Sequence, residues 1–220
     1  VSLNELDTPE YHIVPSKIVA NTIKESHNKW LETPGKKGQK RNDTNIRVFL
    51  DKEDLFFDKW DLLRYQSVDD RLIPSNIYDS LISFIPRLKN IEYAKLYPEQ
   101  QTGDGSIEHP FQMPFYEYAD VVHEFEKEVY KFEKDHPEFQ LNTYNNIFLM
   151  NGLRWDEEVM TKADVSNANG QVVMALILGA IRAERFCDGA LLGFFANGSV
   201  IRWLERLKAL DTDGENIVAK

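Results

Sequence analysis

The sequence contains a single cysteine, Cys187, which excludes a disulfide within the chain and favours a reducing compartment. Long apolar runs are also missing, because the longest, Val172–Ile181, is about half of what a membrane-spanning helix needs. The first residues do not follow the charged, apolar and small order of a signal peptide. We therefore expect a cytoplasmic protein without membrane contact. Because the opening VSLNEL has the character of a strand interior, we also expect the chain to be a fragment.

The usual motifs of catalysis are missing as well. The five histidines show no H-x-x-x-H or H-E-x-x-H spacing, and PGKKGQ (34–39) lacks the spacing of a phosphate-binding loop. GDGS (103–106) lacks the regular acidic ligands of a calcium loop, and no G-x-S-x-G elbow occurs. Cys187 stands in an apolar helical context that predicts an unreactive thiol. We predict no catalytic residue and no metal site, with a site shared by Glu108-His109 and His123 as the alternative.

Acidic residues outnumber basic ones, so that the formal net charge is −10. The excess is uneven, because residues 1–63 carry 10 basic and 11 acidic residues whereas residues 64–220 carry 16 and 25. An acidic surface repels phosphate backbones, which argues against nucleic-acid binding over the larger part. Between Lys24 and Arg47, however, seven basic residues stand against three acidic ones. Any contact with nucleic acid should therefore come from the first segment.

The pattern of apolar residues predicts an α+β fold, in which a small N-terminal strand–helix–loop segment precedes a mainly α-helical domain. We place the first subdomain at residues 1–65 and a linker with the first helix of the second domain at 66–97. The helical domain should span 98–211, followed by a tail at 212–220.

In the first subdomain, Val1–Leu3 and Tyr11–Val14 have the composition of short strands. A helix should follow, with Ser16 as its N-cap, and run to about Trp30. The next stretch, TPGKKGQKRNDT (33–44), holds too many turn formers for regular structure. The closing segment 54–63 should be anchored by four apolar residues: Leu55, Phe56, Trp60 and Leu63.

The second domain should be built from helices. In Tyr118–Lys134 the apolar residues share one stripe and the charged residues face outward, which is typical of an amphipathic helix. Gln171–Phe186 is apolar nearly all round at first, which predicts a central helix. Ser199 should cap the last helix. The predicted helices are residues 73–84, 118–134, 171–186, 190–196 and 200–210.

The basic loop provides candidate nucleic-acid ligands: Lys36, Lys37, Lys40, Arg41 and Arg47. Such side chains on an exposed segment suit phosphate contacts, which position a protein on a duplex without reading its sequence. About four or five contacts of this kind would give measurable, salt-sensitive binding. The alternative is a solvated loop in which Arg47 pairs with a nearby carboxylate.

IRAERFCDG (181–189) provides a second candidate site. Arg182 and Arg185 stand one turn apart at a helix C-terminus, where they complement the helix dipole. In a structural role they would pair with Glu184, Asp188 or Asp156. In a functional role Arg182, Arg185 and Asp188 would form a small-anion site, in an enzyme acting on a phosphorylated or carboxylated ligand.

The motifs VSLNEL, PEYHIVPSKIVA, HNKWLETPGKKGQKRNDTNIRVF and DKWDLL follow one another in residues 1–63. In this order they resemble the C-terminal part of bacterial PD-(D/E)XK nuclease-like proteins. In that class the metal-binding acidic residue and the acid-x-lysine pair precede this tail. The resemblance therefore implies a partial nuclease-like subdomain without an active site. It implies Mg²⁺ as a cofactor only where an upstream nuclease core exists, and it assigns no catalytic residue here.

A second resemblance covers about residues 70–211. HPFQMPFYEYADVVHEFEKEVYKF, LRWDEE and ALILGAIRAERFCDGALLGFFANGSVIRWLERLKAL resemble a bacterial helical family of unknown function. Ala190 stands where the family pattern has a histidine, which weakens any role resting on that side chain. The hallmark Arg-x-x-Arg-Phe-x-x-Gly and the residues after it are here Arg182, Arg185, Phe186, Gly189, Gly198, Arg206 and Leu207.

Together these observations predict a non-catalytic, nucleic-acid-associated or regulatory module of a bacterial nuclease-like or defence protein, with DNA as the partner of the basic loop. An enzyme of the helical domain that binds a small anion or a nucleotide, with its site at Arg182 and Arg185, is one alternative. A protein–protein adaptor that makes its contact through MPFYEY (113–118) is another, although aromatic residues of this kind commonly belong to the core.

Overall fold

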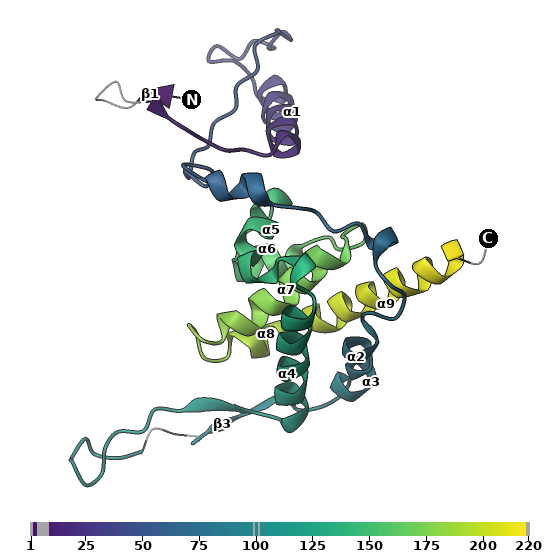
Figure 1. Cartoon of the computed structure of the whole chain (residues 1–220). Coiled ribbons are helices and arrows are strands. Elements are labelled where there is room, and N and C mark those ends of the chain that lie inside the picture. The colour runs from purple at the N-terminus through teal and green to yellow at the C-terminus, as the bar shows by residue number, and fades with distance from the viewer. Residues whose placement is uncertain (1, 4–8, 99, 101, 219–220) are drawn as a thin grey trace. The chain divides into compact units, whose positions relative to one another are not determined.

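The computed structural model describes residues 2–3, 9–98, 100 and 102–218 (Figure 1). The chain forms two compact units. Unit 1 comprises Val1–Tyr65 with Leu149–Gly152, and unit 2 comprises Gln66–Phe148 with Leu153–Lys220. The fold is α+β and mainly helical, which confirms the predicted fold class. No helix in the described part of the chain has both the length and the apolar character needed to cross a membrane.

Unit 1 begins with a small hairpin, in which β1 (Ser2–Leu3) pairs antiparallel with β2 (Pro9–Glu10). The second strand was predicted at Tyr11–Val14 and lies just before it, while Val1 of the first prediction lies outside the described residues. Beyond β2 the chain still pairs, because His12 forms an antiparallel bridge with Phe57.

Helix α1 (Ser16–Glu32) confirms the predicted helix but not its predicted cap. Pro15 occupies the N-cap position, and its carbonyl accepts the first helical hydrogen bond, from the Val19 amide at 3.1 Å. Ser16 is the first helical residue, and no side chain in the described part of the chain caps this end. None of the residues of α1 is buried. Propensity and local contacts therefore contribute more to this helix than burial of an apolar face does.

The closing segment of unit 1 buries one of the four predicted anchors, Phe56, and also Leu62, which was not predicted. It ends in the 3-10 helix η1 (Trp60–Arg64). Phe56 and Leu62 are buried, whereas Trp60 is 48% exposed and Leu63 is 70% exposed. In a 3-10 helix residues three apart share one face, so Trp60 and Leu63 lie together on the exposed side and Leu62 does not.

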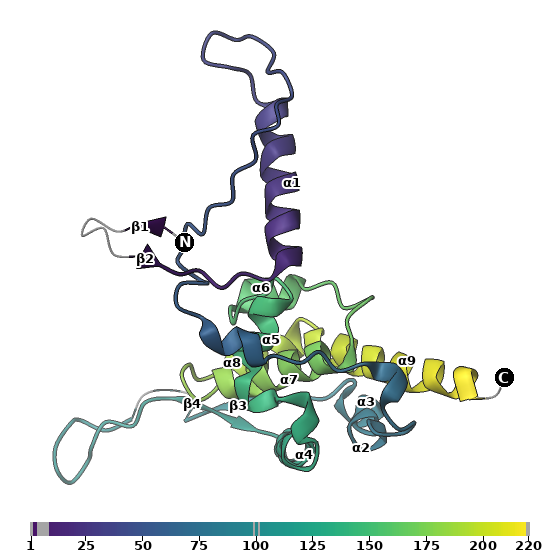
Figure 2. The same cartoon turned by 45° about the horizontal axis from the view of Figure 1, so that its top comes forward.

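Unit 2 is built around α7 (Gly170–Ala183), whose residues from Gly170 to Ile181 are all buried. The helix contacts α4 (Asp120–Asp135), α8 (Ala190–Ala196), α9 (Ser199–Val218) and the 3-10 helix η4 (Leu141–Thr143) (Figure 2). This confirms the predicted central helix. Asn169 caps it, since its side-chain oxygen accepts a hydrogen bond from the Val172 amide at 3.0 Å.

The other predicted helices of unit 2 are confirmed in kind, with two corrections. The single helix predicted for residues 73–84 is wrong, because two short helices, α2 (Asp79–Ile82) and α3 (Phe84–Leu88), follow a turn. Ser199 does not cap α9 but is its first residue; the Ser199 amide donates to Asn197 Oδ1 at 3.0 Å. The remaining helices are η2 (Asp70–Leu72), η3 (Pro137–Phe139), α5 (Tyr144–Met150) and α6 (Glu157–Lys162).

A hairpin arm extends from the helices of unit 2 (Figures 1 and 2). Its strands β3 (Ala94–Tyr97) and β4 (Phe115–Tyr118) pair antiparallel, from Ala94 opposite Tyr118 to Tyr97 opposite Phe115. The loop between them carries one further bridge, between Thr102 and Gln112. Met113 and Phe115 are exposed on this arm, so the expectation that the aromatic stretch 113–118 belongs to the core is wrong for this part of it.

Candidate functional site

The basic loop of unit 1 begins where α1 ends (Figure 2). Lys36, Lys37 and Lys40 are all exposed, and nothing in the described part of the chain forms an ion pair with them. Arg47 differs, because its guanidinium lies 3.4 Å from Asp43 and donates to the carbonyl of Ile46 at 3.0 Å. Arg47 therefore stabilises the loop itself, and its pairing with a carboxylate is what the solvated-loop alternative predicted.

A small stack fastens this loop to the last turns of α1. The guanidinium of Arg41 lies 4.8 Å from the centre of the Trp30 ring, and the His27 ring stacks with Trp30 at 5.7 Å. His27 Nε2 is 2.8 Å from Asp43 Oδ1. The hydrogen bond with His27, together with nearby Arg47, lowers the pKa of Asp43. These contacts hold both sides of the lysine-bearing turn, and spacing alone did not reveal the roles of His27 and Trp30.

In unit 2, the two hallmark arginines both contact α4. The Arg182 guanidinium lies 2.7 Å from Glu133 and 5.1 Å from the centre of the Tyr144 ring. The Arg185 guanidinium donates to the Tyr130 hydroxyl at 2.8 Å and lies over that ring. The predicted pairing of Arg182 with Glu184, Asp188 or Asp156 is wrong, because Glu133 on a neighbouring helix is its partner.

Asp188 lies apart from this arginine contact. Its carboxylate accepts a hydrogen bond from the Tyr116 amide of β4 at 3.1 Å. Glu184 pairs with backbone amides at the start of α8 instead. Its carboxylate accepts hydrogen bonds from the amides of Gly189 and Leu191 at 2.8 Å each. It also accepts from the Tyr118 hydroxyl at 2.8 Å. Burial, followed by the bond to Glu184, raises the pKa of Tyr118.

Side chains of α4, including Tyr130, which contacts Arg185, line an open depression with a volume of about 450 Å³. Three of its lining residues are carboxylates, and Lys127 is the one formal positive charge among them. Glu124 also pairs with Arg87. An acidic lining disfavours anions, so this geometry lends no support to the small-anion alternative. The lining residues are Asp120, His123, Glu124, Glu126, Lys127 and Tyr130.

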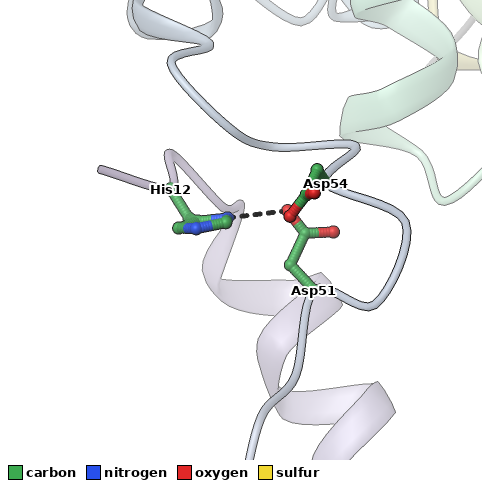
Figure 3. A group of neighbouring side chains, drawn as sticks. All are labelled: His12, Asp51 and Asp54. Atoms are coloured by element: carbon green, nitrogen blue, oxygen red, sulfur yellow. Dashed lines mark hydrogen bonds and ion pairs between the residues drawn. The ribbon is translucent and has the colours of Figure 1, made fainter. Parts of the chain in front are cut away.

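A third cluster brings His12, Asp51 and Asp54 together in unit 1 (Figure 3). Their possible ligand atoms all lie within 4.8 Å of one another. A search for histidine spacings could not find this group, because 39 residues separate His12 from Asp51. Cys187, which was expected in an apolar helical environment, lies instead exposed beyond the end of α7.

Comparison with known protein families gives a match for the larger part of the chain. No curated protein and no solved structure matches it. A family model described as a family of unknown function (DUF6508) matches residues 73–213, which contain α7, α8 and the hallmark arginines. This match agrees with the resemblance inferred for about residues 70–211. Because it covers more than half of the residues, the chain belongs to the DUF6508 family.

Proposed function

We propose that the chain is a nucleic-acid-binding module that contacts phosphate groups through the basic loop of unit 1. The observation that carries this proposal is the turn that exposes Lys36, Lys37 and Lys40 while the stack of Arg41, Trp30 and His27 holds its sides. Exposed lysines release counterions when they neutralise phosphates, and a held loop loses less conformational freedom on binding.

The distribution of acidic residues along the sequence also favours the basic loop as the nucleic-acid-binding surface. Residues 64–220 carry 25 acidic and 16 basic residues, so they repel a polyanion, whereas the first 63 residues are nearly neutral. The motif order of residues 1–63 further supports DNA as the partner and a nuclease-like parent protein. In this proposal the module binds without cutting, and the DUF6508 domain regulates or docks it.

Replacing the three exposed lysines tests the proposal. We expect K36A/K37A/K40A to bind a labelled DNA duplex about 10- to 100-fold more weakly than the unmodified chain at about 50 mM salt, because each lysine contributes a phosphate contact. Fluorescence anisotropy measures the affinity, and circular dichroism checks the fold.

The matched control is K127A/K131A/K134A, which removes the same charge from exposed positions on α4. It should bind DNA as tightly as the unmodified chain. Equal losses in both triple variants would show a response to net charge alone and would contradict a loop-specific site, as would the lack of any binding at low salt.

A second candidate function is self-association through the hairpin arm. The arm exposes an unusual number of large apolar side chains, and surfaces of this kind mark protein contacts. Within the described residues, β3 and β4 pair only with each other, so each keeps a free edge. Lys95 stands opposite Glu117 in the strand register, so a second copy turned by a half-rotation would bring residues of opposite charge together. The exposed apolar residues are Leu96, Tyr97, Ile107, Phe111, Met113 and Phe115.

Sedimentation velocity over increasing protein concentration tests this second function. We expect a dimer at about micromolar concentrations that Tyr97→Ser/Phe115→Ser weakens at least about 10-fold, because both rings would be buried between copies. Leu72→Ser, at another exposed apolar position of unit 2, should leave the dimer intact. A monomer at every concentration would contradict self-association through the arm.

A further inference from the structure

We propose that His12, Asp51 and Asp54 form a binding site for one divalent transition-metal ion of the Zn²⁺ class. The site offers one imidazole nitrogen and two carboxylate oxygens, all within 4.8 Å of one another. Figure 3 shows the His12 ring on one segment facing the two carboxylates on the loop opposite. This inference does not depend on nucleic-acid binding.

Backbone pairing fixes the two halves of the site. The Ile13 amide donates to the carbonyl of Phe56 at 2.9 Å, and the Asp58 amide donates to the carbonyl of Tyr11 at 2.8 Å. His12 and Phe57 are bridge partners between these two bonds. The imidazole is therefore held against the turn that carries both aspartates, although the two segments are distant in sequence.

Asp51 is oriented as metal-binding carboxylates commonly are. Its side chain is only 6% exposed, and its two oxygens accept hydrogen bonds from the amides of Leu55 at 3.1 Å and Phe56 at 2.9 Å. Outer hydrogen bonds of this kind fix the direction of a ligand's lone pairs. His12 Nδ1 lies 2.9 Å from Asp51 Oδ2, so two of the three ligand atoms are already next to each other.

Among the described residues, Asp54 supplies a carboxylate without an ion-pair partner. Its backbone is in the left-handed region (φ 51°), where a non-glycine residue is uncommon. No residue of the described chain forms a hydrogen bond or an ion pair with its side chain. Two carboxylates this close repel each other, and a divalent ion between them would replace the repulsion with attraction.

The donor set indicates the class of ion. A mixed nitrogen and oxygen set suits Zn²⁺ and related transition ions, whereas Mg²⁺ and Ca²⁺ prefer oxygen ligands alone. Ligand bonds of about 2.0–2.2 Å place neighbouring ligands of a tetrahedral site about 3.4 Å apart, so a pair as far apart as 4.8 Å would have to move closer together. Asp54 is exposed and can make this movement. Three protein ligands leave a further position for water or an anion.

Titration of the metal-free full-length chain with ZnCl₂, followed by calorimetry, tests the site. We expect one Zn²⁺ per chain, with affinity reduced at least about 10-fold in Asp54→Asn and in His12→Gln, since each removes a ligand. Asparagine tolerates the left-handed backbone at position 54, so Asp54→Asn should keep the turn. Co²⁺ should give visible absorption bands of a low-coordinate site that both variants lose.

His27→Gln is the matched control, because His27 also lies 2.8 Å from an aspartate, Asp43, but belongs to no three-ligand group among the described residues. It should bind Zn²⁺ as the unmodified chain does. Absence of Zn²⁺ binding would overturn the proposal. Unchanged affinity in folded Asp54→Asn, or an equal loss in His27→Gln, would overturn it as well.

Discussion

Replacing Gln171 with leucine is expected to lower the free energy of unfolding of unit 2 by about 3–5 kcal/mol, because three backbone groups would lose their partner. Gln171 is fully buried in the first turn of α7. Its amide nitrogen donates to the carbonyls of Gln66 at 3.0 Å and Phe139 at 2.9 Å, and its oxygen accepts from the Val68 amide at 3.2 Å. Leucine has a similar size but makes none of these bonds.

Chemical denaturation followed by circular dichroism measures this change. Gln140→Asn is the matched control, because Gln140 is only partly buried and accepts a single long, solvent-exposed hydrogen bond, 3.3 Å, from the Gln66 amide. Asparagine also suits the left-handed backbone at position 140 (φ 53°). The control should change stability by less than about 1 kcal/mol. A similarly small effect of Gln171→Leu would contradict the role assigned to Gln171.

Replacing Glu184 with alanine is expected to destabilise unit 2 by about 2–4 kcal/mol, because three donors would lose a charged acceptor. Two of these donors, the amides of Gly189 and Leu191, stand at the start of α8, and the third is the Tyr118 hydroxyl. That hydroxyl in turn accepts from the Leu192 amide at 3.0 Å. Loss of the carboxylate would therefore loosen both the start of α8 and the attachment of β4.

Thermal and chemical denaturation of Glu184→Ala test this role. Asp188→Asn provides the comparison, since this exposed side chain keeps an acceptor for the Tyr116 amide after the change. It should cost less than about 1 kcal/mol. Equal stability of Glu184→Ala and the unmodified chain would show that water can replace the carboxylate, against our interpretation.

The long helices of unit 2 could be predicted because their burial follows a regular period. Val122, Phe125, Val129 and Phe132 recur at spacings of three and four and form the buried face of α4. In α7 the apolar residues occur on every side, and the helix is buried on every side. A regular pattern over several turns leaves few alternatives.

Short elements gave weaker signals. The predicted helix 73–84 begins only at Asp79, because Asn76 takes a left-handed backbone (φ 69°), which periodicity does not reveal. In the closing segment of unit 1, Leu62 is the buried residue of the 3-10 helix, whereas Trp60 and Leu63, which were predicted to be buried, are exposed. Few residues per element leave the period undetermined.

The sites depended on contacts between distant residues, which no local pattern contains. Arg182 pairs with Glu133, 49 residues away, rather than with the acidic residues that follow it. His12 meets Asp51 only because the residues around each form backbone hydrogen bonds. The basic loop was found from composition, but the stack that holds it, between Trp30, His27 and Arg41, required the structure.

The salt dependence of DNA affinity tests the central claim most directly. The logarithm of the association constant, plotted against the logarithm of salt concentration, should have a slope about 2–3 units shallower in K36A/K37A/K40A than in the unmodified chain, since three phosphate contacts are lost. The slope of K127A/K131A/K134A should equal that of the unmodified chain. An unchanged slope in the loop variant would show that these lysines do not meet phosphates, and would contradict the account.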